Sequence, residues 1–362
     1  MTRQPAIYAI HGENDLDYPG WEIRTEELGH DPTHAGGTDY RHARHTVIAR
    51  LNHGYEPNGT IPRPEHYQAF AARVARFVAA SEGCTRWIIG NEPNCAWERP
   101  GGMPITPDLY ARCYDLCYQA IHSLPGHQND EVLIAAVGPW NPQTTYPGND
   151  RGDWLTYFRH IQEHARTLDG FAIHAYAREQ NPDAVNRRNP MVPPDWSGHD
   201  WGFRVFEDWM NMIRAEYRGL PVYCTEFNAN APWQNINNGF VQAAYQAIHS
   251  WNWAHRRRPI SCLALYRWQT DKWVIRDKPE VLRDSQQAVN LGYVVPDPCP
   301  PVDDPPQPEP EPPQPEPPPA QPAPDYAEAL TRIEAMLIEQ GAQLDELMER
   351  FRVAGFALAG EQ

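Results

Sequence analysis

Two stretches of the sequence decide the expected fold: Trp87-Ile88-Ile89-Gly90-Asn91-Glu92-Pro93-Asn94 and Pro221-Val222-Tyr223-Cys224-Thr225-Glu226-Phe227-Asn228. In each stretch an apolar run leads into a polar segment that contains a glutamate. A strand that is buried on both faces is apolar along its length, and the active site of a β/α barrel forms at the carboxyl ends of such strands. We therefore expect Glu92 and Glu226 to face each other across the mouth of a barrel.

Similar apolar runs recur along the first 295 residues and alternate with amphipathic stretches. Seven runs are expected to be strands, at residues 6–11, 46–52, 86–92, 131–137, 170–176, 221–227 and 261–268. An eighth run, at residues 21–28, alternates only weakly. Five segments between the runs have helical periodicity, at residues 64–80, 107–123, 153–168, 201–217 and 238–255. Strands that alternate with helices predict a parallel sheet, so residues 1–295 are expected to form an α/β fold, a (β/α)8 TIM barrel.

A doubly wound open sheet is the structural rival of this barrel. Such a sheet carries a glycine-rich, phosphate-binding turn after its first strand. Here His11-Gly12-Glu13-Asn14 follows the first apolar run instead. The closed barrel is therefore favoured.

The last part of the chain has a different composition. From Pro296 to Pro324, 16 of 29 residues are proline. Because proline interrupts both helices and sheets, and because apolar side chains are scarce, residues 296–324 are expected to be an extended linker with a reach of about 3.1 Å per residue.

An amphipathic pattern follows this linker, in residues 325–362. Its seam positions alternate steps of four and three residues and are Tyr326, Leu330, Ile333, Leu337, Gln340, Leu344, Leu347 and Phe351. This spacing predicts a coiled-coil helix. We favour a helix that joins copies of the chain or anchors it to an assembly partner, because a helix that docks on its own barrel would not need so long a spacer. Similar segments tether catalytic heads to larger assemblies, including virions. Docking of the helix on its own barrel is the alternative.

Most of the net charge of −16 lies in this tail. Residues 296–362 hold 14 acidic and 3 basic residues, so the first 295 residues are only mildly acidic. No binding of nucleic acid or of an anionic membrane surface is expected, and no apolar run is long enough to span a bilayer.

The first seven residues lack the apolar stretch of a signal peptide. We expect synthesis in the cytoplasm and leave later release or association with a virion open.

Metal binding is the chemistry that the 15 histidines suggest first. A metal-dependent barrel hydrolase would close its first strand with His-x-His, whereas the first run here ends in the single His11. Seven cysteines without regular spacing predict neither a disulfide framework nor a zinc ribbon. We therefore expect no metal and no cofactor.

The motifs at the strand ends resemble those of the retaining glycoside hydrolases of clan A, β/α-barrel enzymes that include family 5 cellulases and family 39-like enzymes. When the run at residues 21–28 is counted as the second strand, the fourth run ends in Asn91-Glu92-Pro93 and the sixth in His174-Ala175-Tyr176. The seventh contains Glu226 near its end, and the eighth ends in Trp268. The resemblance covers residues 1–295. It implies a glycosidase that cleaves β-linked polysaccharide or oligosaccharide through a covalent intermediate.

The same resemblance assigns roles to individual residues. Glu92 is expected to be the general acid/base and Glu226 the nucleophile. Substrate-binding roles fall to Asn91 at the sugar 2-hydroxyl, His174 in the same subsite, Tyr176 as the residue that orients Glu226, and Trp268 as the stacking platform. Arg50 is expected to be the cation that keeps the nucleophile ionised.

Tryptophans in the segments after the strands support a carbohydrate partner independently. They are Trp97, Trp140, Trp196, Trp201, Trp233 and Trp273. Exposed tryptophan lowers solubility unless it packs or binds something, and flat sugar faces are natural partners. For Trp97 and Trp196, burial under loops is the competing interpretation. The competing function is a catalytically silent glycan-binding barrel in a cell-surface or virion assembly, although such a module has no need for paired glutamates.

Overall fold

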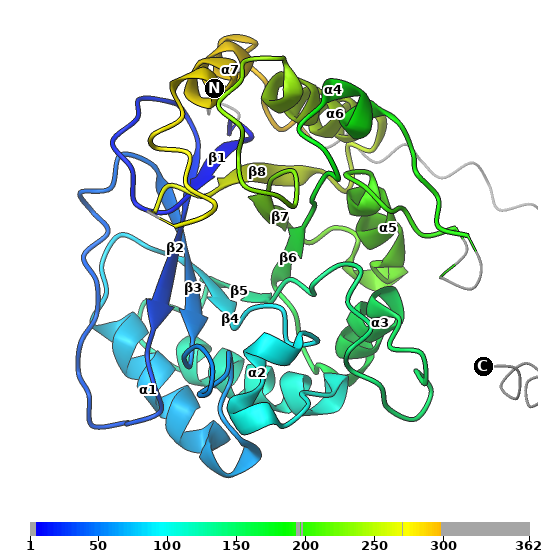
Figure 1. Cartoon of the computed structure of the whole chain (residues 1–362). Coiled ribbons are helices and arrows are strands. Elements are labelled where there is room, and N and C mark those ends of the chain that lie inside the picture. Colours follow the sequence, from blue (N-terminus) through cyan, green and yellow to red (C-terminus); the bar gives the residue numbers. More distant parts are fainter. Residues whose placement is uncertain (1–4, 193–195, 197, 270, 298–362) are drawn as a thin grey trace, which may run out of the picture. The chain divides into compact units, whose positions relative to one another are not determined.

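The computed structural model describes residues 5–192, 196, 198–269 and 271–297, and the structural statements below concern these residues. Within them, parallel strands close into a barrel in chain order (Figure 1). The strands are β1 (Tyr8–His11), β2 (Trp21–Glu27), β3 (Thr46–Asn52), β4 (Arg86–Ile89), β5 (Glu131–Ile134), β6 (Gly170–His174), β7 (Val222–Phe227) and β8 (Ile260–Tyr266). The weakly alternating run is thus the second strand, and the predicted (β/α)8 barrel is confirmed.

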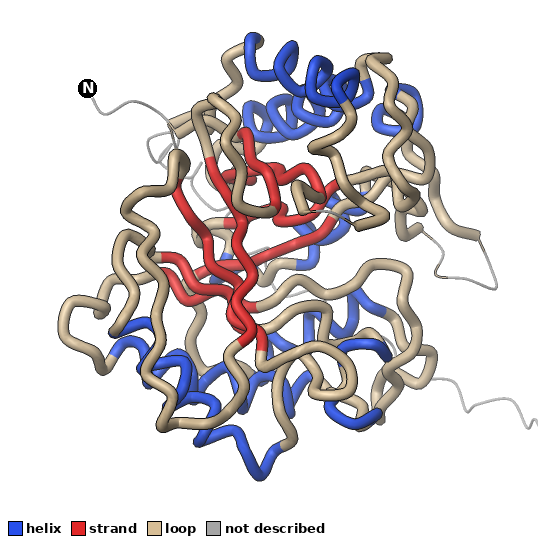
Figure 2. Tube along the Cα trace, turned by 60° about the vertical axis from the view of Figure 1, so that its left-hand side comes forward, coloured by secondary structure: helices blue, strands red, loops and turns tan. Residues whose placement is uncertain are grey.

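Helices surround the strands (Figure 2). They are α1 (Tyr67–Ala79), α2 (Pro107–His122), α3 (Trp154–His164), α4 (Pro182–Asn186), α5 (Val205–Met212), α6 (Phe240–Ala254) and α7 (Pro279–Asn290). Short 3-10 turns are η1 (Pro64–His66), η2 (Ala96–Glu98), η3 (Pro100–Gly102) and η4 (Ala215–Tyr217). Two of the α-helices, α4 and α7, were not predicted from the sequence.

The helix expected at residues 201–217 is shorter than its periodicity indicates. α5 ends at Met212, and Ile213 has an extended backbone with φ −63° and ψ 126°. The next amide, that of Arg214, donates to Oε1 of Gln162 on α3 at 3.0 Å instead of continuing the helix. The apolar pattern continues past the helix because Tyr217, in η4, also packs against the core.

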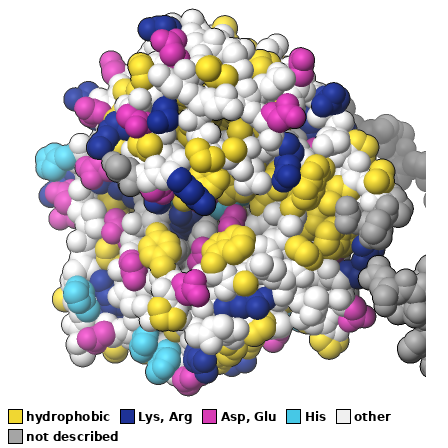
Figure 3. Space-filling view, viewed as in Figure 1, with side chains coloured by type: hydrophobic (Ala, Val, Ile, Leu, Met, Phe, Trp, Pro, Cys, Tyr) yellow, Lys and Arg dark blue, Asp and Glu magenta, His cyan; other side chains and the backbone are white. Residues whose placement is uncertain are grey.

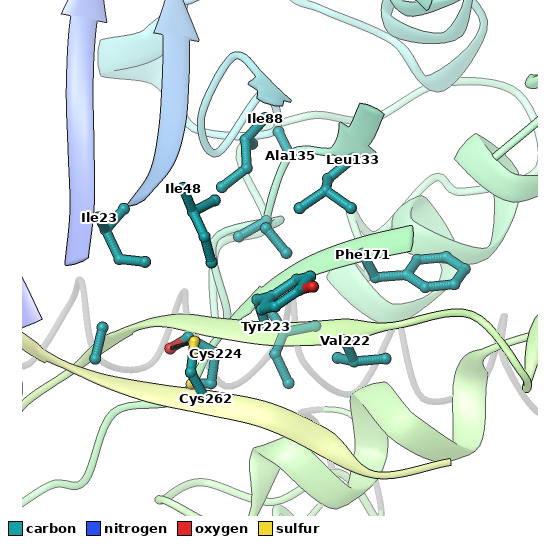
Figure 4. Close-up of a cluster of buried hydrophobic side chains, with 14 of the residues drawn as sticks. Ile23, Ile48, Ile88, Leu133, Ala135, Phe171, Val222, Tyr223, Cys224 and Cys262 are labelled. Atoms are coloured by element: carbon teal, nitrogen blue, oxygen red, sulfur yellow. Dashed lines mark hydrogen bonds between the residues drawn. The ribbon is translucent and has the colours of Figure 1, made fainter. Parts of the chain in front are cut away.

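Apolar side chains from neighbouring strands hold the barrel together. Ile23, Ile48, Ile88 and Leu133 are at most 1% exposed and gather in one buried cluster (Figure 4). Ile23 is in register with Ile48, and Ile88 with Leu133. Burying such a side chain contributes about 1.5–3 kcal/mol. This packing fixes the strands and thereby the spacing of the side chains at their carboxyl ends.

The described residues contain no helix that is both long and apolar enough to cross a membrane. They end at Asp297. The proline-rich linker at residues 296–324 and the coiled-coil helix at residues 325–362 lie almost wholly outside them, so both stay predictions.

Candidate active site

A pocket with a volume of about 800 Å³ opens at the carboxyl ends of the strands. Residues that follow six different strands line it, among them Tyr55, Glu92, Trp140, Arg178, Asn228 and Trp273. The backbone is unusual here, because three non-glycine residues with positive φ in the described chain, Glu92, Trp140 and Asn230, all line this pocket. Such strained conformations concentrate at functional sites.

Glu226 lies on β7 at the base of the pocket and is 5% exposed. Its Oε1 accepts a hydrogen bond from Nη1 of Arg50 at 2.6 Å, and its Oε2 accepts one from the Tyr176 hydroxyl at 2.8 Å. Burial alone would raise the pKa of the Glu226 carboxyl, but the electrostatic interactions with His174 and Arg50 outweigh it and hold that pKa well below its usual range. Glu226 is therefore ionised at neutral pH, as its expected role requires.

Glu92 follows β4 and is held by both backbone and side-chain contacts. Its φ is 34°, and its amide donates to the carbonyl of Ala136 at 2.9 Å. Its Oε1 lies 2.8 Å from Nδ1 of His174, and its Oε2 lies 3.6 Å from Sγ of Cys95. A Cβ at Gly138 would come within 3.2 Å of the Glu92 carboxyl carbon and 2.4 Å of the Cys95 sulfur, so this approach requires glycine.

The Tyr176 hydroxyl joins the two carboxylates. It lies 3.3 Å from Oε1 of Glu92 and 2.8 Å from Oε2 of Glu226, so these two oxygens are at most about 6 Å apart. A pair of carboxyl groups about 5 to 5.5 Å apart suits attack on a sugar by one of them, whereas an intervening water requires about 6.5 to 9.5 Å. The geometry therefore suits a covalent intermediate.

Arg50 and Asn91 extend this network away from Glu226. Arg50 lies on β3 and is 3% exposed, and its Nη1 also donates to Oδ1 of Asn91 at 2.6 Å. Nδ2 of Asn91 donates in turn to Oε1 of Glu98 at 3.0 Å. Protein atoms thus fix the Asn91 side chain, and its expected bond to a sugar 2-hydroxyl stays a prediction that rests on the second hydrogen of Nδ2.

Glu98 is a third carboxyl group in the pocket, and sequence reasoning missed it. It lies in η2, and its buried Oε2 has no hydrogen-bond partner among the described residues. Burial, together with the charge of Glu92, raises the pKa of Glu98 to about 8. The residue is therefore neutral below that pH. Nothing in the local sequence distinguishes it from a surface glutamate of an irregular loop.

Trp268, the expected stacking platform, does not line this pocket. It is 8% exposed and borders a separate pocket with Glu13 and Arg24. β8 ends at Tyr266, two residues earlier than expected, and Tyr266 and Trp273 line the active-site pocket in its place. The position of the strand end therefore decides which aromatic residue faces the pocket.

Four of the six tryptophans singled out in the sequence line the pocket: Trp97, Trp140, Trp201 and Trp273. The other two pack within the protein. Trp233 is buried, and its Nε1 donates to the carbonyl of Tyr266 at 2.7 Å. Trp196 packs edge-on against Trp154, with ring centroids 4.7 Å apart. Trp140, one of the tryptophans expected to contact the carbohydrate, is anchored by a hydrogen bond of 2.9 Å from its Nε1 to the carbonyl of Asp200.

Among the described residues, no group of three or more His, Cys, Asp or Glu side chains is arranged to hold a metal ion.

Comparison with known proteins places the fold among glycoside hydrolases. No protein-family model and no curated protein matches the sequence. The structure resembles a family 39 glycoside hydrolase from the gut symbiont Bacteroides cellulosilyticus WH2, with a TM-score of 0.51 and 16% sequence identity. The match covers 80% of this chain and 64% of that one. It also resembles the catalytic domain of the GH26 endo-β-1,4-mannanase of Bacillus sp. JAMB-750, with a TM-score of 0.50 and 11% identity over 80% of this chain and 86% of that one. The expected likeness to clan A glycoside hydrolases is thus confirmed for the fold.

Proposed function

We propose that this chain is a retaining glycoside hydrolase that cleaves β-glycosidic bonds of a polysaccharide or oligosaccharide by double displacement. The observation that carries the proposal is the contact of one hydroxyl, that of Tyr176, with both Glu92 and Glu226, at 3.3 and 2.8 Å. Two carboxyl groups this close, in an aromatic-lined pocket at the carboxyl ends of the barrel strands, are the working parts of a glycosidase.

The first step forms a glycosyl ester. The ionised carboxylate of Glu226 attacks the anomeric carbon while protonated Glu92 gives its proton to the glycosidic oxygen, so that the bond to the leaving group breaks. Arg50 and Tyr176, which hydrogen-bond the two oxygens of Glu226, aim the attacking carboxylate. His174, between the two glutamates, fixes the orientation of Glu92.

The second step releases the sugar. The Glu92 carboxylate takes a proton from a water molecule, whose oxygen attacks the anomeric carbon and displaces Glu226. Both glutamates return to their starting states, and two inversions leave the β configuration intact. Trp140, Tyr266 and Trp273, which line the pocket, are the aromatic surfaces proposed to stack on the sugar rings.

Glu92 variants distinguish the proposed glycosidase from the competing function, a catalytically silent glycan-binding barrel. They are assayed on a panel of polysaccharides and aryl β-glycosides. Glu92→Ala should lose most activity on polysaccharide but keep more on aryl glycosides with good leaving groups, which need little protonation. Azide should then raise the rate and give a β-glycosyl azide, because it attacks without a general base.

Two further variants complete this test. Glu226→Gln should abolish turnover with the fold intact, because it removes the nucleophile. Glu131→Gln is the matched control, since Glu131 begins β5 and pairs with Arg86 at 3.3 Å outside the pocket. A protein that binds glycans and releases no product from any member of the panel would leave only the binding function.

A further inference from the structure

Arg178, in the loop after β6, is held against two tryptophans at the pocket rim. Its guanidinium carbon lies 4.2 Å from the ring centroid of Trp201 and 5.3 Å from that of Trp140. Among the described residues no carboxylate pairs with Arg178, and the side chain is exposed. An arginine stacked on an indole keeps the edge of its guanidinium free to donate hydrogen bonds. Here that edge is available to a ligand in the pocket.

A second cation stands at the same pocket, in the segment after β8. Nζ of Lys272 lies 4.8 Å from the ring centroid of Trp273, and both residues line the pocket. Lys272 is exposed and likewise has no carboxylate partner in the described part of the chain. Figure 3 shows Lys and Arg side chains beside hydrophobic ones on this face of the molecule.

This gathering of cations runs against the composition of the chain, which has 47 acidic and 31 basic residues. The acidic residues of the pocket, Glu92, Glu98 and Glu226, are all at most 8% exposed. They belong to the buried base, where Arg50 already neutralises Glu226. The accessible charge at the rim is therefore positive.

Building on the proposed glycosidase function, we propose that the substrate is an anionic β-glycan, whose carboxylate or sulfate substituents are bound by Arg178 and Lys272. A guanidinium edge matches the paired oxygens of either group, and the two tryptophans fix its orientation before the ligand arrives. The cations come from loops two strands apart in the barrel, so charged substituents on different sugars of one chain are the ligands that fit them. If Arg178 merely covered the tryptophans, the charge of the glycan would not change its affinity for the protein.

Binding to the Glu92→Gln variant, which cannot protonate the leaving group and keeps the ion pair of Arg50 with Glu226, tests this with turnover of glycans largely removed. The probes are β-1,4- and β-1,3-glucuronan oligosaccharides, their carboxyl-reduced neutral forms, and those neutral forms after sulfation, measured by calorimetry. At low salt we expect at least one anionic form to bind about tenfold more tightly than its neutral counterpart, as expected for one charge-assisted contact. The preference should largely disappear at about 0.5 M NaCl. Comparison of the uronate and sulfate arms identifies the anion.

Variants in the same background assign the preference to residues. Arg178→Gln should remove most of it and leave binding of the neutral forms unchanged, and Lys272→Gln should weaken it. Arg256→Gln is the matched control, because the Arg256 guanidinium carbon also lies 4.2 Å from a tryptophan ring, that of Trp253, outside the pocket. Equal binding of charged and neutral forms in every pair, or equal losses for both in Arg178→Gln, would overturn the inference.

These outcomes are distinct from failure of the proposed function. If the wild-type protein hydrolyses only neutral glycans, the glycosidase stands and the anionic substrate falls. If it binds anionic glycans through Arg178 but hydrolyses none, the cationic subsite stands and the glycosidase falls.

Discussion

Arg50 and Glu226 form a buried ion pair, with Nη1 of the arginine 2.6 Å from Oε1 of the glutamate. Their side chains are only 4% and 6% exposed. A charge enclosed in this way loses its hydration, and the loss of its partner is far more costly than the loss of a surface charge pair. The pair therefore serves both the stability of the fold and the ionisation of the proposed nucleophile.

Replacing Arg50 by Met should raise the pKa of Glu226, because one of the charges that lower it is lost. The acid limb of kcat/KM should move to higher pH. The low pKa of Glu226 also stabilises the folded state above the ordinary value of 4.5, and this contribution disappears as pH falls through the lowered pKa. Urea unfolding at neutral pH should show a loss of about 3–5 kcal/mol.

Arg283→Met is the control for this substitution, since Arg283 pairs with Glu280 at 2.6 Å with its side chain 60% exposed. It should change stability by less than about 1 kcal/mol. An unchanged acid limb in Arg50→Met would contradict the role given to Arg50.

Glu98 should make the protein less stable as pH rises. Its pKa of about 8 in the folded state exceeds the ordinary 4.5, so the folded state binds the extra proton between these values, and stability falls across that range. The variant Glu98→Gln keeps the acceptor for Asn91 and cannot ionise. It should therefore reduce the loss of unfolding free energy between pH 5 and pH 9 by a few kcal/mol, on the order of the pKa shift converted to free energy. Urea unfolding from pH 5 to pH 9 measures it. An unchanged pH dependence would mean that Glu98 titrates normally.

Trp273 and Trp268 should behave differently on substitution by alanine. Trp273 lines the active-site pocket, so its loss should raise KM more than it lowers kcat. Trp268 is buried outside that pocket, so its loss should lower stability by about 3–5 kcal/mol and leave KM near the wild-type value. Steady-state kinetics and thermal unfolding of both variants decide the matter. A rise in KM for Trp268→Ala alone would restore it as the stacking platform.

These two tryptophans also show what the sequence could and could not predict. The apolar runs before Glu92 and Glu226 are buried strands, and a buried parallel strand has a clear sequence pattern, so both glutamates were located in advance. The end of β8 was misplaced by two residues because the large aromatic side chain of Trp268 follows Tyr266 after a single arginine. Because of this error Trp268 was expected at the pocket, where the structure has Tyr266.

Residues in irregular segments were harder to predict. Glu98, Cys95 and Arg178 reach the pocket through loops and a 3-10 turn, where neither periodicity nor a strand end sets the direction of a side chain. Helix α7 was missed although Val281 and Ala288 lie on its buried face, because its mean composition is strongly polar. Long-range contacts, not local pattern, determine these positions.

The C-terminal seam predicts self-association of the full-length chain. Burying a leucine side chain contributes about 1.5–3 kcal/mol, and an isolated helix of this length is only marginally stable in water. A helix whose seam stayed exposed would therefore lack most of its stabilisation. Light scattering should show an oligomer for the full chain and a monomer for Leu337→Lys combined with Leu344→Lys, whereas Glu334→Gln, off the seam, should have no effect. A monomeric full-length chain at micromolar concentration would leave docking on the barrel or a different partner as the role of the tail.

The stereochemistry of the first product tests the central claim most directly. In the proposed mechanism Glu226 forms a glycosyl ester, and Glu92 then activates a water on the face of the sugar that the leaving group vacated. The product is therefore released as the β-anomer and mutarotates afterwards. Proton NMR in the first minutes of the reaction distinguishes the two anomeric protons. We predict initial appearance of the β-anomer alone. Initial release of the α-anomer would contradict the covalent intermediate and the roles of both glutamates.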